Sequence, residues 1–264
     1  YSAEDQRRLA SLAEHFARRA LALDEGQAHA HYALGWMHVI NRRWRSSEES
    51  LARAYALNPN DYLVANGAAW ANAHLKDCDR GVRIMEHSLM LNPNDLAGQP
   101  NFVDLLVLCE RWDQANRQAS LVTSLLPGPY AHQLLAEVNS FLGEVDSARR
   151  NAAIAEVPGF GLGRVANVYR RIGDLDVAQR VFSHAGSHVE TVALNPEFYF
   201  LIHMAVGDTE AAIAGLEHAI DVGFPWTVSR DLHYFSDHPY FDPVRSHPKF
   251  EELVRRAAVP LEQH

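Results

Sequence analysis

The carboxyl-terminal part of the chain holds the densest group of side chains that could bind a metal ion or transfer protons: Asp237, His238, Asp242 and His247. Imidazole nitrogens and carboxylates are common ligands of zinc, and histidine also acts as a general acid or base near neutral pH. A proline follows each of the two histidines, which places both in turns ahead of helix starts. We therefore expect turn and capping roles, with a metal-dependent enzyme that uses this His-rich tail as an alternative.

The other motifs that could carry chemistry are weaker. His184 and His188 have the spacing of two metal ligands on one helix face, but Gly186 lies between them and no third ligand is evident. No Walker-type loop, dinucleotide fingerprint, HExxH pair or GxSxG elbow occurs in the sequence. The glycine-rich stretch at 158–163 has no strand before it, and we interpret it as a joint between helices. The sequence thus predicts no catalytic residue, no cofactor and no metal.

The helices that position any functional side chain can be predicted from a sequence repeat of 34 residues. The string LNPND occurs at 57–61 and again at 91–95, and Gly-Asp pairs at 173–174 and 207–208 have the same offset. Small residues recur at the eighth and twentieth positions of this period, as two closely packed helices require. No segment alternates with a period of two over the length of a strand, so the pattern predicts an all-α fold.

These columns predict helical hairpins, each made of a first helix (helix A), a tight turn and a second helix (helix B). A leading helix over 1–27 places Ala13, Ala17 and Ala20 in the small-residue columns of a helix B. Glycine at the turn is favoured because a left-handed backbone costs least there. The expected turn glycines are Gly143, Gly173 and Gly207. The predicted repeats span 28–61, 62–95, 96–128, 129–158, 159–192 and 193–222, and a carboxyl-terminal cap spans 223–264.

The period and the small-residue columns resemble those of the tetratricopeptide repeat family, over residues 28–222 and, with the leading helix, from residue 2. The resemblance implies a solenoid of helical hairpins, a right-handed superhelix with helix A lining its concave face. Residues 238–256, HPYFDPVRSHPKFEELVRR, resemble the tail that closes such arrays in bacterial signalling proteins. There the arrays follow adenylate or guanylate cyclase domains or winged-helix transcription regulators. The second resemblance implies a regulatory or scaffolding segment of a larger bacterial signalling protein.

Two tryptophans mark the predicted concave face. Trp36 and Trp70 are 34 residues apart and therefore lie on the same face of adjacent repeats. Aromatic residues with asparagine and arginine beside them commonly anchor a protein-binding surface. The alternative is that both indole rings pack between neighbouring helices A as core. The residues predicted to contact a partner are Tyr32, Trp36, Asn66, Trp70, Gln133, Glu137, Asn167 and Arg170.

Composition limits the partners. The 264 residues include 24 Lys and Arg against 33 Asp and Glu, and the formal charge of −9 argues against nucleic acid as a partner of this segment. No apolar run approaches the ~20 residues that cross a bilayer, and no secretion leader is visible. The two cysteines, Cys78 and Cys109, lie in helical patterns and are expected to be buried free thiols.

Together these observations predict a non-catalytic module that binds a protein or a peptide in the cytoplasm and contacts no membrane. A self-assembling structural array of the same repeats is the alternative from a different class, and homo-oligomerisation is left open. The chain begins with Tyr1. An enzymatic or DNA-binding domain upstream is compatible with this prediction.

Overall fold

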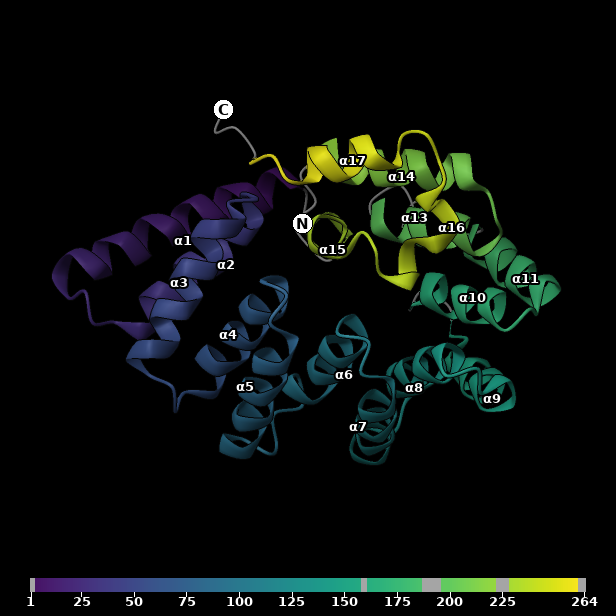
Figure 1. Cartoon of the computed structure of the whole chain (residues 1–264), viewed down its shortest axis with the longest axis horizontal. Coiled ribbons are helices and arrows are strands. Elements are labelled where there is room, and N and C mark those ends of the chain that lie inside the picture. Colours follow the sequence, from purple (N-terminus) through teal and green to yellow (C-terminus); the bar gives the residue numbers. More distant parts are fainter. Residues whose placement is uncertain (1–2, 158–160, 187–195, 222–227, 261–264) are drawn as a thin grey trace. The chain divides into compact units, whose positions relative to one another are not determined.

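A computed structural model describes residues 3–157, 161–186, 196–221 and 228–260. Within these ranges the chain forms helices joined by short turns, and no β-strand is present (Figure 1). Tertiary contacts divide the chain into two compact units. Unit 1 comprises Tyr1–Gly98, Ala219–Ser236 and Glu251–His264, and unit 2 comprises Gln99–His218 and Asp237–Phe250.

The amino-terminal helices of unit 1 form a leading helix followed by two hairpins, α2 with α3 and α4 with α5 (Figure 1). Their bounds are α1 (Ala3–Leu23), α2 (Ala28–Ile40), α3 (Trp44–Leu57), α4 (Tyr62–His74) and α5 (Cys78–Leu91). Unit 2 continues the alternation of helices A and B. It contains α6 (Gly98–Leu108), α7 (Trp112–Leu125), α8 (Pro129–Phe141), α9 (Val145–Ala155), α10 (Leu162–Arg171), α11 (Leu175–Gly186), α13 (Pro196–Ala205) and most of α14 (Thr209–Asp221).

The carboxyl-terminal segment, predicted as one cap, is divided between the two units. Unit 1 receives α15 (Val228–Phe235) and nearly all of α17 (Phe250–Ala257). Unit 2 receives the short helices η1 (Pro239–Phe241) and α16 (Asp242–Arg245). Each unit is therefore built from repeats and from a part of this segment.

Helix starts follow the repeat pattern. The helices α2, α4 and α8 begin at the first residues of three predicted repeats, and α6, α10 and α13 begin two or three residues later. The LNPND joint explains one of these starts. The carboxylate of Asp61 accepts hydrogen bonds from the backbone N–H groups of Leu63 and Val64 at 3.0 and 3.1 Å. This cap satisfies two of the N–H groups that a helix leaves unpaired at its amino end.

The turns between helices A and B share one backbone feature. Gly143, Gly173 and Gly207 have φ values of 74°, 86° and 77°, as predicted. The corresponding residues of the first three hairpins also have positive φ, although none of them is glycine. They are Arg42 at 52°, Lys76 at 63° and Glu110 at 53°. A left-handed backbone costs a non-glycine residue about 1–2 kcal/mol, so these three turns are held by the helices on either side.

Close helix packing explains the small-residue columns. A Cβ atom on Gly35 would lie 2.5 Å from the side chain of Leu51, and one on Gly81 would lie 2.8 Å from the carbonyl oxygen of Ala69. Both positions bring helix B against helix A of the same hairpin. The buried core is correspondingly rich in alanine, valine and leucine.

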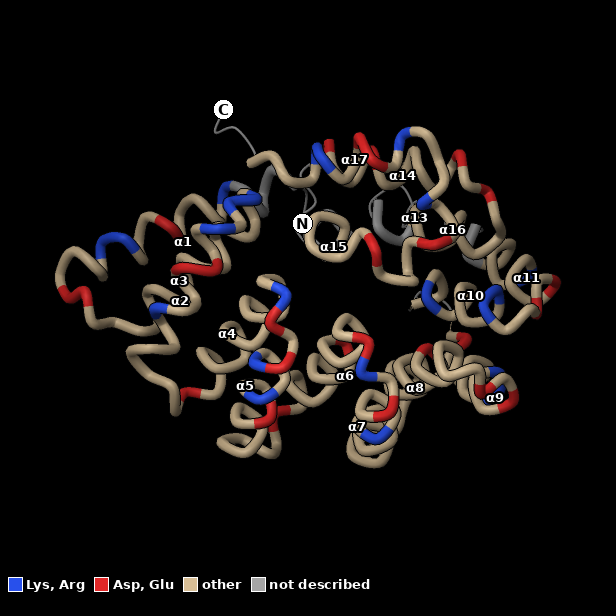
Figure 2. The backbone as a smooth tube through the Cα atoms, viewed as in Figure 1, with Lys and Arg blue, Asp and Glu red and all other residues tan. Residues whose placement is uncertain are grey.

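No described helix is both long enough and apolar enough to cross a membrane. Acidic and basic positions are interspersed along the helices rather than gathered into one basic stripe (Figure 2). The negative charge predicted from composition is therefore spread over both units.

Candidate functional site

The predicted contact residues of unit 1 form a half-buried aromatic surface on the first helices of two hairpins. On α2, the rings of Tyr32 and Trp36 meet edge to face with centroids 6.2 Å apart. On α4, Trp70 lies 6.1 Å from the ring of His74, and the amide of Asn66 donates to the sulfur of Met85 at 3.5 Å. All four predicted residues are partly exposed. Their exposure lies between that of an open binding surface and that of a buried core, the two alternatives that the sequence left open.

The backbone beneath this surface allows the rings to lie close to it. A Cβ atom on Gly67 would come within 2.9 Å of the ring of Tyr32, so this glycine lets the tyrosine ring of α2 approach α4 closely. Burial raises the pKa of the Tyr32 hydroxyl, and the nearby charge of Asp61 raises it further. The phenol therefore stays neutral and acts as a hydrogen-bonding group at physiological pH.

The predicted residues of unit 2 are placed differently. Gln133, Glu137 and Asn167 are only 3%, 5% and 3% exposed. The amide of Asn167 donates to the carbonyl oxygens of Gly163 and Leu201 at 2.9 and 2.6 Å, and so joins α10 to α13. Such a side chain holds neighbouring helices together and presents no atom to a partner.

The carboxylate of Glu137 belongs to an ion cluster. The guanidinium of Arg164 lies 3.4 Å from Glu137 and 3.0 Å from Asp104, which links α6, α8 and α10. Burial alone would lower the pKa of Arg164, but the two carboxylates outweigh burial and raise it well above its usual range. Arg170, the last predicted residue, is half-buried, and burial lowers its pKa although the charge of Asp242 acts in the opposite direction.

Residues of the carboxyl-terminal segment pack against these helices of unit 2. His238 is 4% exposed, and its ring lies 5.9 Å from the rings of both Trp112 and Phe141. Its Nδ1 accepts from the backbone N–H of Tyr240 at 3.1 Å, so the proton is on Nε2, which donates to the carbonyl oxygen of Val107 at 3.1 Å. His238 thus caps η1, the role predicted for it.

The second tail histidine has a similar role. Nδ1 of His247 accepts from the backbone N–H of Lys249, and Nε2 lies 3.2 Å from a carboxylate oxygen of Glu210. No group of three potential metal ligands is found among the described residues. The other histidine pair cannot be assessed, because His188 lies outside the described residues.

In unit 1, α15 docks on α3 and α4 through aromatic rings. The ring of Tyr234 stacks on His74 with centroids 4.8 Å apart and planes 14° apart, and its hydroxyl donates to Glu48. His233 stacks on Trp44 at 5.9 Å. The indole N–H of Trp44 donates to the carbonyl oxygen of Ala257 at 3.0 Å, which fastens α17 to the same helix.

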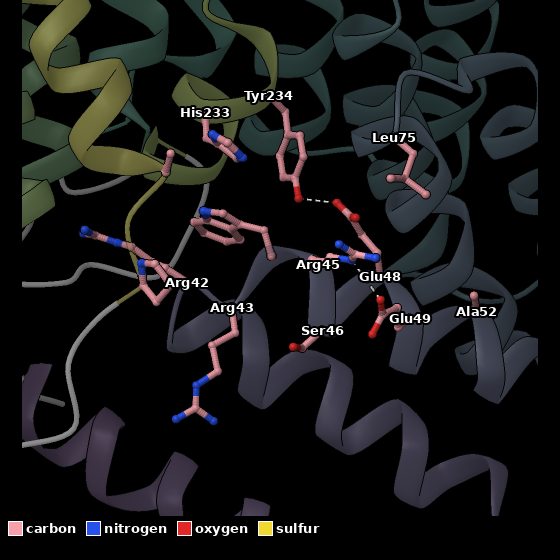
Figure 3. Close-up of a pocket in the computed structure, with 13 residues that line it drawn as sticks. Arg42, Arg43, Arg45, Ser46, Glu48, Glu49, Ala52, Leu75, His233 and Tyr234 are labelled. Carbon is pink, nitrogen blue, oxygen red and sulfur yellow. Dashed lines mark hydrogen bonds and ion pairs between the residues drawn. The ribbon is translucent and has the colours of Figure 1, made fainter.

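A pocket of about 740 Å³ opens beside these contacts (Figure 3). Its volume lies within the ~300–1,000 Å³ range of small-ligand pockets. The lining residues are Arg42, Arg43, Trp44, Arg45, Ser46, Glu48, Glu49, Ala52, Leu75, His233, Tyr234, Ala258 and Pro260. The amino end of α3 is part of this wall and has no side-chain cap, which favours negative charge there.

The charged residues of the pocket are already engaged within unit 1. Arg42 donates to the carbonyl oxygens of Ala219 and Ile220 at the end of α14, and burial lowers its pKa to about 10. Arg43 pairs with Glu14 at 3.3 Å, and Arg45 pairs with Glu49 at 3.0 Å. In Figure 3 the tyrosine hydroxyl and the Glu48 carboxylate point toward one another. The pocket thus combines aromatic rings with three arginines and two glutamates whose side chains already have partners within unit 1.

Sequence reasoning did not identify Trp44 or Trp112, the tryptophans that contact the carboxyl-terminal segment. A signal was present: the two are 68 residues apart, which is twice the repeat period, so both occupy the first position of a helix B. In this structure the tryptophan at that position contacts the carboxyl-terminal segment in both units: Trp44 contacts His233 and Ala257, and Trp112 contacts His238.

Solved structures similar to this chain are tetratricopeptide repeat proteins. One from Parabacteroides merdae is 14% identical and aligns with 95% of this chain and 93% of its own, with a TM-score of 0.61. Pseudomonas aeruginosa PilF is 18% identical, covers 78% of this chain and 91% of its own, and has a TM-score of 0.57. PilW, a type IV pilus biogenesis factor, is 17% identical, covers 76% and 95%, and has a TM-score of 0.52.

These similarities establish the fold and not the function. No protein-family model matches the chain, and no curated protein matches its sequence. The fold is an all-α helix-turn-helix solenoid of the tetratricopeptide type, as the repeat columns predicted.

Proposed function

We propose that this chain is a non-catalytic module that binds a protein or peptide through the aromatic surface of unit 1. The observation that carries the proposal is the pair Trp36 and Trp70, which occupy the same position of adjacent repeats and stay half-buried. Large, partly exposed rings at helical spacing supply contact area at a small cost in side-chain entropy. Tyr32 and Asn66 stand beside them and add a neutral hydroxyl and an amide for pairing with a peptide backbone.

The predicted residues of unit 2 have a different role in this proposal. Gln133, Glu137 and Asn167 are buried, and Arg170 is half-buried beside them. We assign these four to holding the helices of unit 2 and not to contact with the partner. The partner surface then consists of residues of α2 and α4 alone.

A wider context is part of the proposal. The likeness of residues 238–256 to the tails of bacterial signalling arrays supports a regulatory or scaffolding role within a larger protein. The charge of −9 and the interspersed charges support a protein partner over nucleic acid. Sequencing the gene upstream of Tyr1 tests this context, since a cyclase or winged-helix domain is expected there.

One observation argues against the predicted cytoplasmic location. Cys78 and Cys109 are both disulfide-bonded, so the expectation of free thiols is wrong. Structural disulfides are rare in the cytosol, where thiols are kept reduced. A thiol count on protein purified under native conditions decides the matter: two reactive thiols support the cytoplasm, and none supports an oxidising compartment.

Two alternatives differ in class from a binding module. A self-assembling array predicts a mass that rises with concentration in light scattering. A metal-dependent enzyme predicts a stoichiometric metal in untagged protein. Such a metal would have to displace the hydrogen bonds that both ring nitrogens of His238 and of His247 make.

Panning a displayed peptide library against the folded chain tests the main proposal. For the selected peptides, Trp36→Ala together with Trp70→Ala is expected to weaken binding at least ~30-fold, about 2 kcal/mol, in fluorescence anisotropy. Met90→Ala is the matched control, because this side chain is 71% exposed on α5. Circular dichroism confirms that both variants fold. Equal affinity of the double variant and the control would contradict the proposed surface.

A further inference from the structure

Arg42, a cation that lines the pocket beside α3, is buried without a carboxylate partner in the described chain. Its side chain is only 3% exposed, and its guanidinium donates to the carbonyl oxygens of Ala219 and Ile220 at the end of α14. The Nε–H group of Arg42 is buried and has no hydrogen-bond partner among the described residues. Asp221, whose charge raises the pKa of Arg42, is itself paired with Arg256. A buried charge in this state is stabilised by an added anion.

The first turn of α3 adds hydrogen-bond donors to the same pocket. The first backbone hydrogen bond of this helix runs from the N–H of Ser47 to the carbonyl oxygen of Arg43. The N–H groups of residues 44–46 precede that bond, so they have no partner within the helix, and no side chain caps them. All three residues line the pocket, and the hydroxyl of Ser46 is a further donor there (Figure 3). N–H groups aligned at the start of a helix bind anions.

The charges around the pocket leave the side at Arg42 positive. The carboxylate of Glu14 lies 2.6 Å from Arg18 and 3.3 Å from Arg43, so one carboxylate serves two guanidinium groups. In Figure 3 the two glutamates that line the pocket lie on the opposite side from Arg42, and each is bonded to another side chain. The anionic end of a ligand is therefore attracted to Arg42 rather than to the other side of the pocket.

The rest of the pocket favours an organic anion over a bare one. A volume of about 740 Å³ is far larger than a single phosphate or carboxylate group. The walls include the rings of Trp44, His233 and Tyr234 and the apolar side chains of Ala52 and Leu75 (Figure 3). A ring or a short apolar chain on the ligand would cover these surfaces and remove them from water.

We propose that this pocket binds a small organic anion, whose carboxylate or phosphate group meets the Nε–H of Arg42 and the first N–H groups of α3. The apolar body of the ligand packs against the aromatic wall. All the residues named for this site belong to unit 1, and none of them is part of the aromatic surface of α2 and α4. The two proposals are therefore tested independently.

An NMR titration of the folded chain tests the proposal, with phenyl phosphate and phenylacetate as the probes. Benzyl alcohol is the control without a charge, and inorganic phosphate is the control without a ring. Each aromatic anion is expected to bind at least ~10-fold more tightly than either control. Binding is expected to shift the Nε–H signal of Arg42 and the amide signals of residues 44–46. The tighter of the two anions shows whether phosphate or carboxylate is the preferred group.

Ser46→Asp distinguishes this site from one elsewhere on the chain. A carboxylate in the first turn of α3 stabilises the helix, but it takes the position of the ligand's anionic group. The affinity for both aromatic anions is expected to fall at least ~10-fold. Ser50→Asp is the matched control, because it adds the same charge one turn later and does not line the pocket; a change below ~3-fold is expected. Arg42→Gln is also expected to lower the affinity at least ~10-fold, and circular dichroism shows whether it folds.

Four results would overturn the proposal. Benzyl alcohol that binds as tightly as the aromatic anions would remove the role of charge, and inorganic phosphate that does so would remove the role of the apolar wall. Affinity that Ser46→Asp does not reduce would place the anion elsewhere. The fourth is absence of binding by both aromatic anions up to millimolar concentrations.

Discussion

The ninth position of the repeat has opposite surroundings in the two units. In unit 1 it holds Trp36 and Trp70, which are large, aromatic and partly exposed. In unit 2 it holds Asp104, Glu137, Asn167 and Leu201, of which the last three are buried and Asp104 is paired with Arg164. The same backbone position can therefore serve a partner or the fold, depending on whether neighbouring groups of the chain complete its bonds. Equivalent positions on successive helices A predict that their side chains lie on the same face of the array. They do not predict whether that face is accessible to a partner.

The two units also hold the carboxyl-terminal segment by different means. Unit 1 uses stacked rings and a buried indole N–H, through Trp44, Tyr234 and His74. In unit 2, the ring of His238 lies 5.9 Å from the rings of Trp112 and Phe141, which stack on one another at 4.5 Å. The guanidinium of Arg171 lies 3.7 Å above the same phenyl ring. Burial lowers the pKa of Arg171 to about 10, so its positive charge persists at neutral pH.

Both units bury apolar side chains of this segment, such as Phe235 in unit 1 and Phe241, 6.3 Å from Phe200, in unit 2. The units differ at the first position of helix B, where Trp44 is 6% exposed and Trp112 is only half-buried.

The largest expected effect comes from Trp44→Ala. The side chain is 6% exposed and its N–H is bonded, so removal leaves a cavity and an unpaired carbonyl group at Ala257. The expected loss of unfolding free energy is about 3–5 kcal/mol. Trp112→Ala is the matched variant in unit 2; because Trp112 is only half-buried, we expect about half of that loss.

Urea denaturation measures both losses, and hydrogen exchange shows where they act. For Trp44→Ala, faster exchange is expected in α3, α15 and α17, with unit 2 unaffected. Equal losses for the two tryptophans would remove the proposed difference between the units.

A smaller effect is expected from Arg164→Met in unit 2. This change leaves the buried carboxylate of Glu137 without its cation. Breaking a buried pair on one side costs ~3–5 kcal/mol, but Arg164 keeps 29% of its side chain exposed, so we expect about 2 kcal/mol. Adding Glu137→Gln to the same chain is expected to recover about half of the loss, which a double-mutant cycle in urea measures. Additive losses would show that the two side chains do not interact.

The sequence predicts the repeat architecture well because each hairpin is specified locally. The small residues Gly35 and Gly81 and the cap formed by Asp61 each act within one or two neighbouring helices. Features of this kind recur with the repeat period, so they can be recognised in a single sequence. The non-glycine turns at Arg42, Lys76 and Glu110 were not predicted, because the flanking helices impose their positive φ.

The docking of the carboxyl-terminal segment was not predicted for a different reason. Its contacts join residues far apart in the sequence, such as Trp44 with Ala257 and Tyr234 with Glu48, and no period relates them. The burial of Gln133, Glu137 and Asn167 follows from packing of the same kind, between helices whose spacing the repeat alone does not set.

The smallest expected effect is a loss of stability at acidic pH that is confined to unit 1. Burial lowers the pKa values of His38 and His233, both in unit 1. Arg43 and Arg18 lower the pKa of His38 further, and Glu14 raises it. His233 faces Trp44 and Tyr234, and shares its pocket with Arg42, Arg43, Arg45, Glu48 and Glu49.

Both imidazoles are therefore neutral in the folded state at a pH where the unfolded chain already binds protons. Their stabilisation is complete above the unfolded pKa near ~6.5 and is lost as the pH falls through that value toward the folded pKa. Acidification from pH 7.5 to 5.5 is therefore expected to lower the stability of unit 1. Hydrogen exchange in α3 and α15 at the two pH values measures this loss, with α8 and α10 of unit 2 as the reference. His233→Gln, which cannot be protonated, is expected to reduce the difference between the pH values. If this variant loses as much protection on acidification as the native chain, His233 does not cause the acid sensitivity of unit 1.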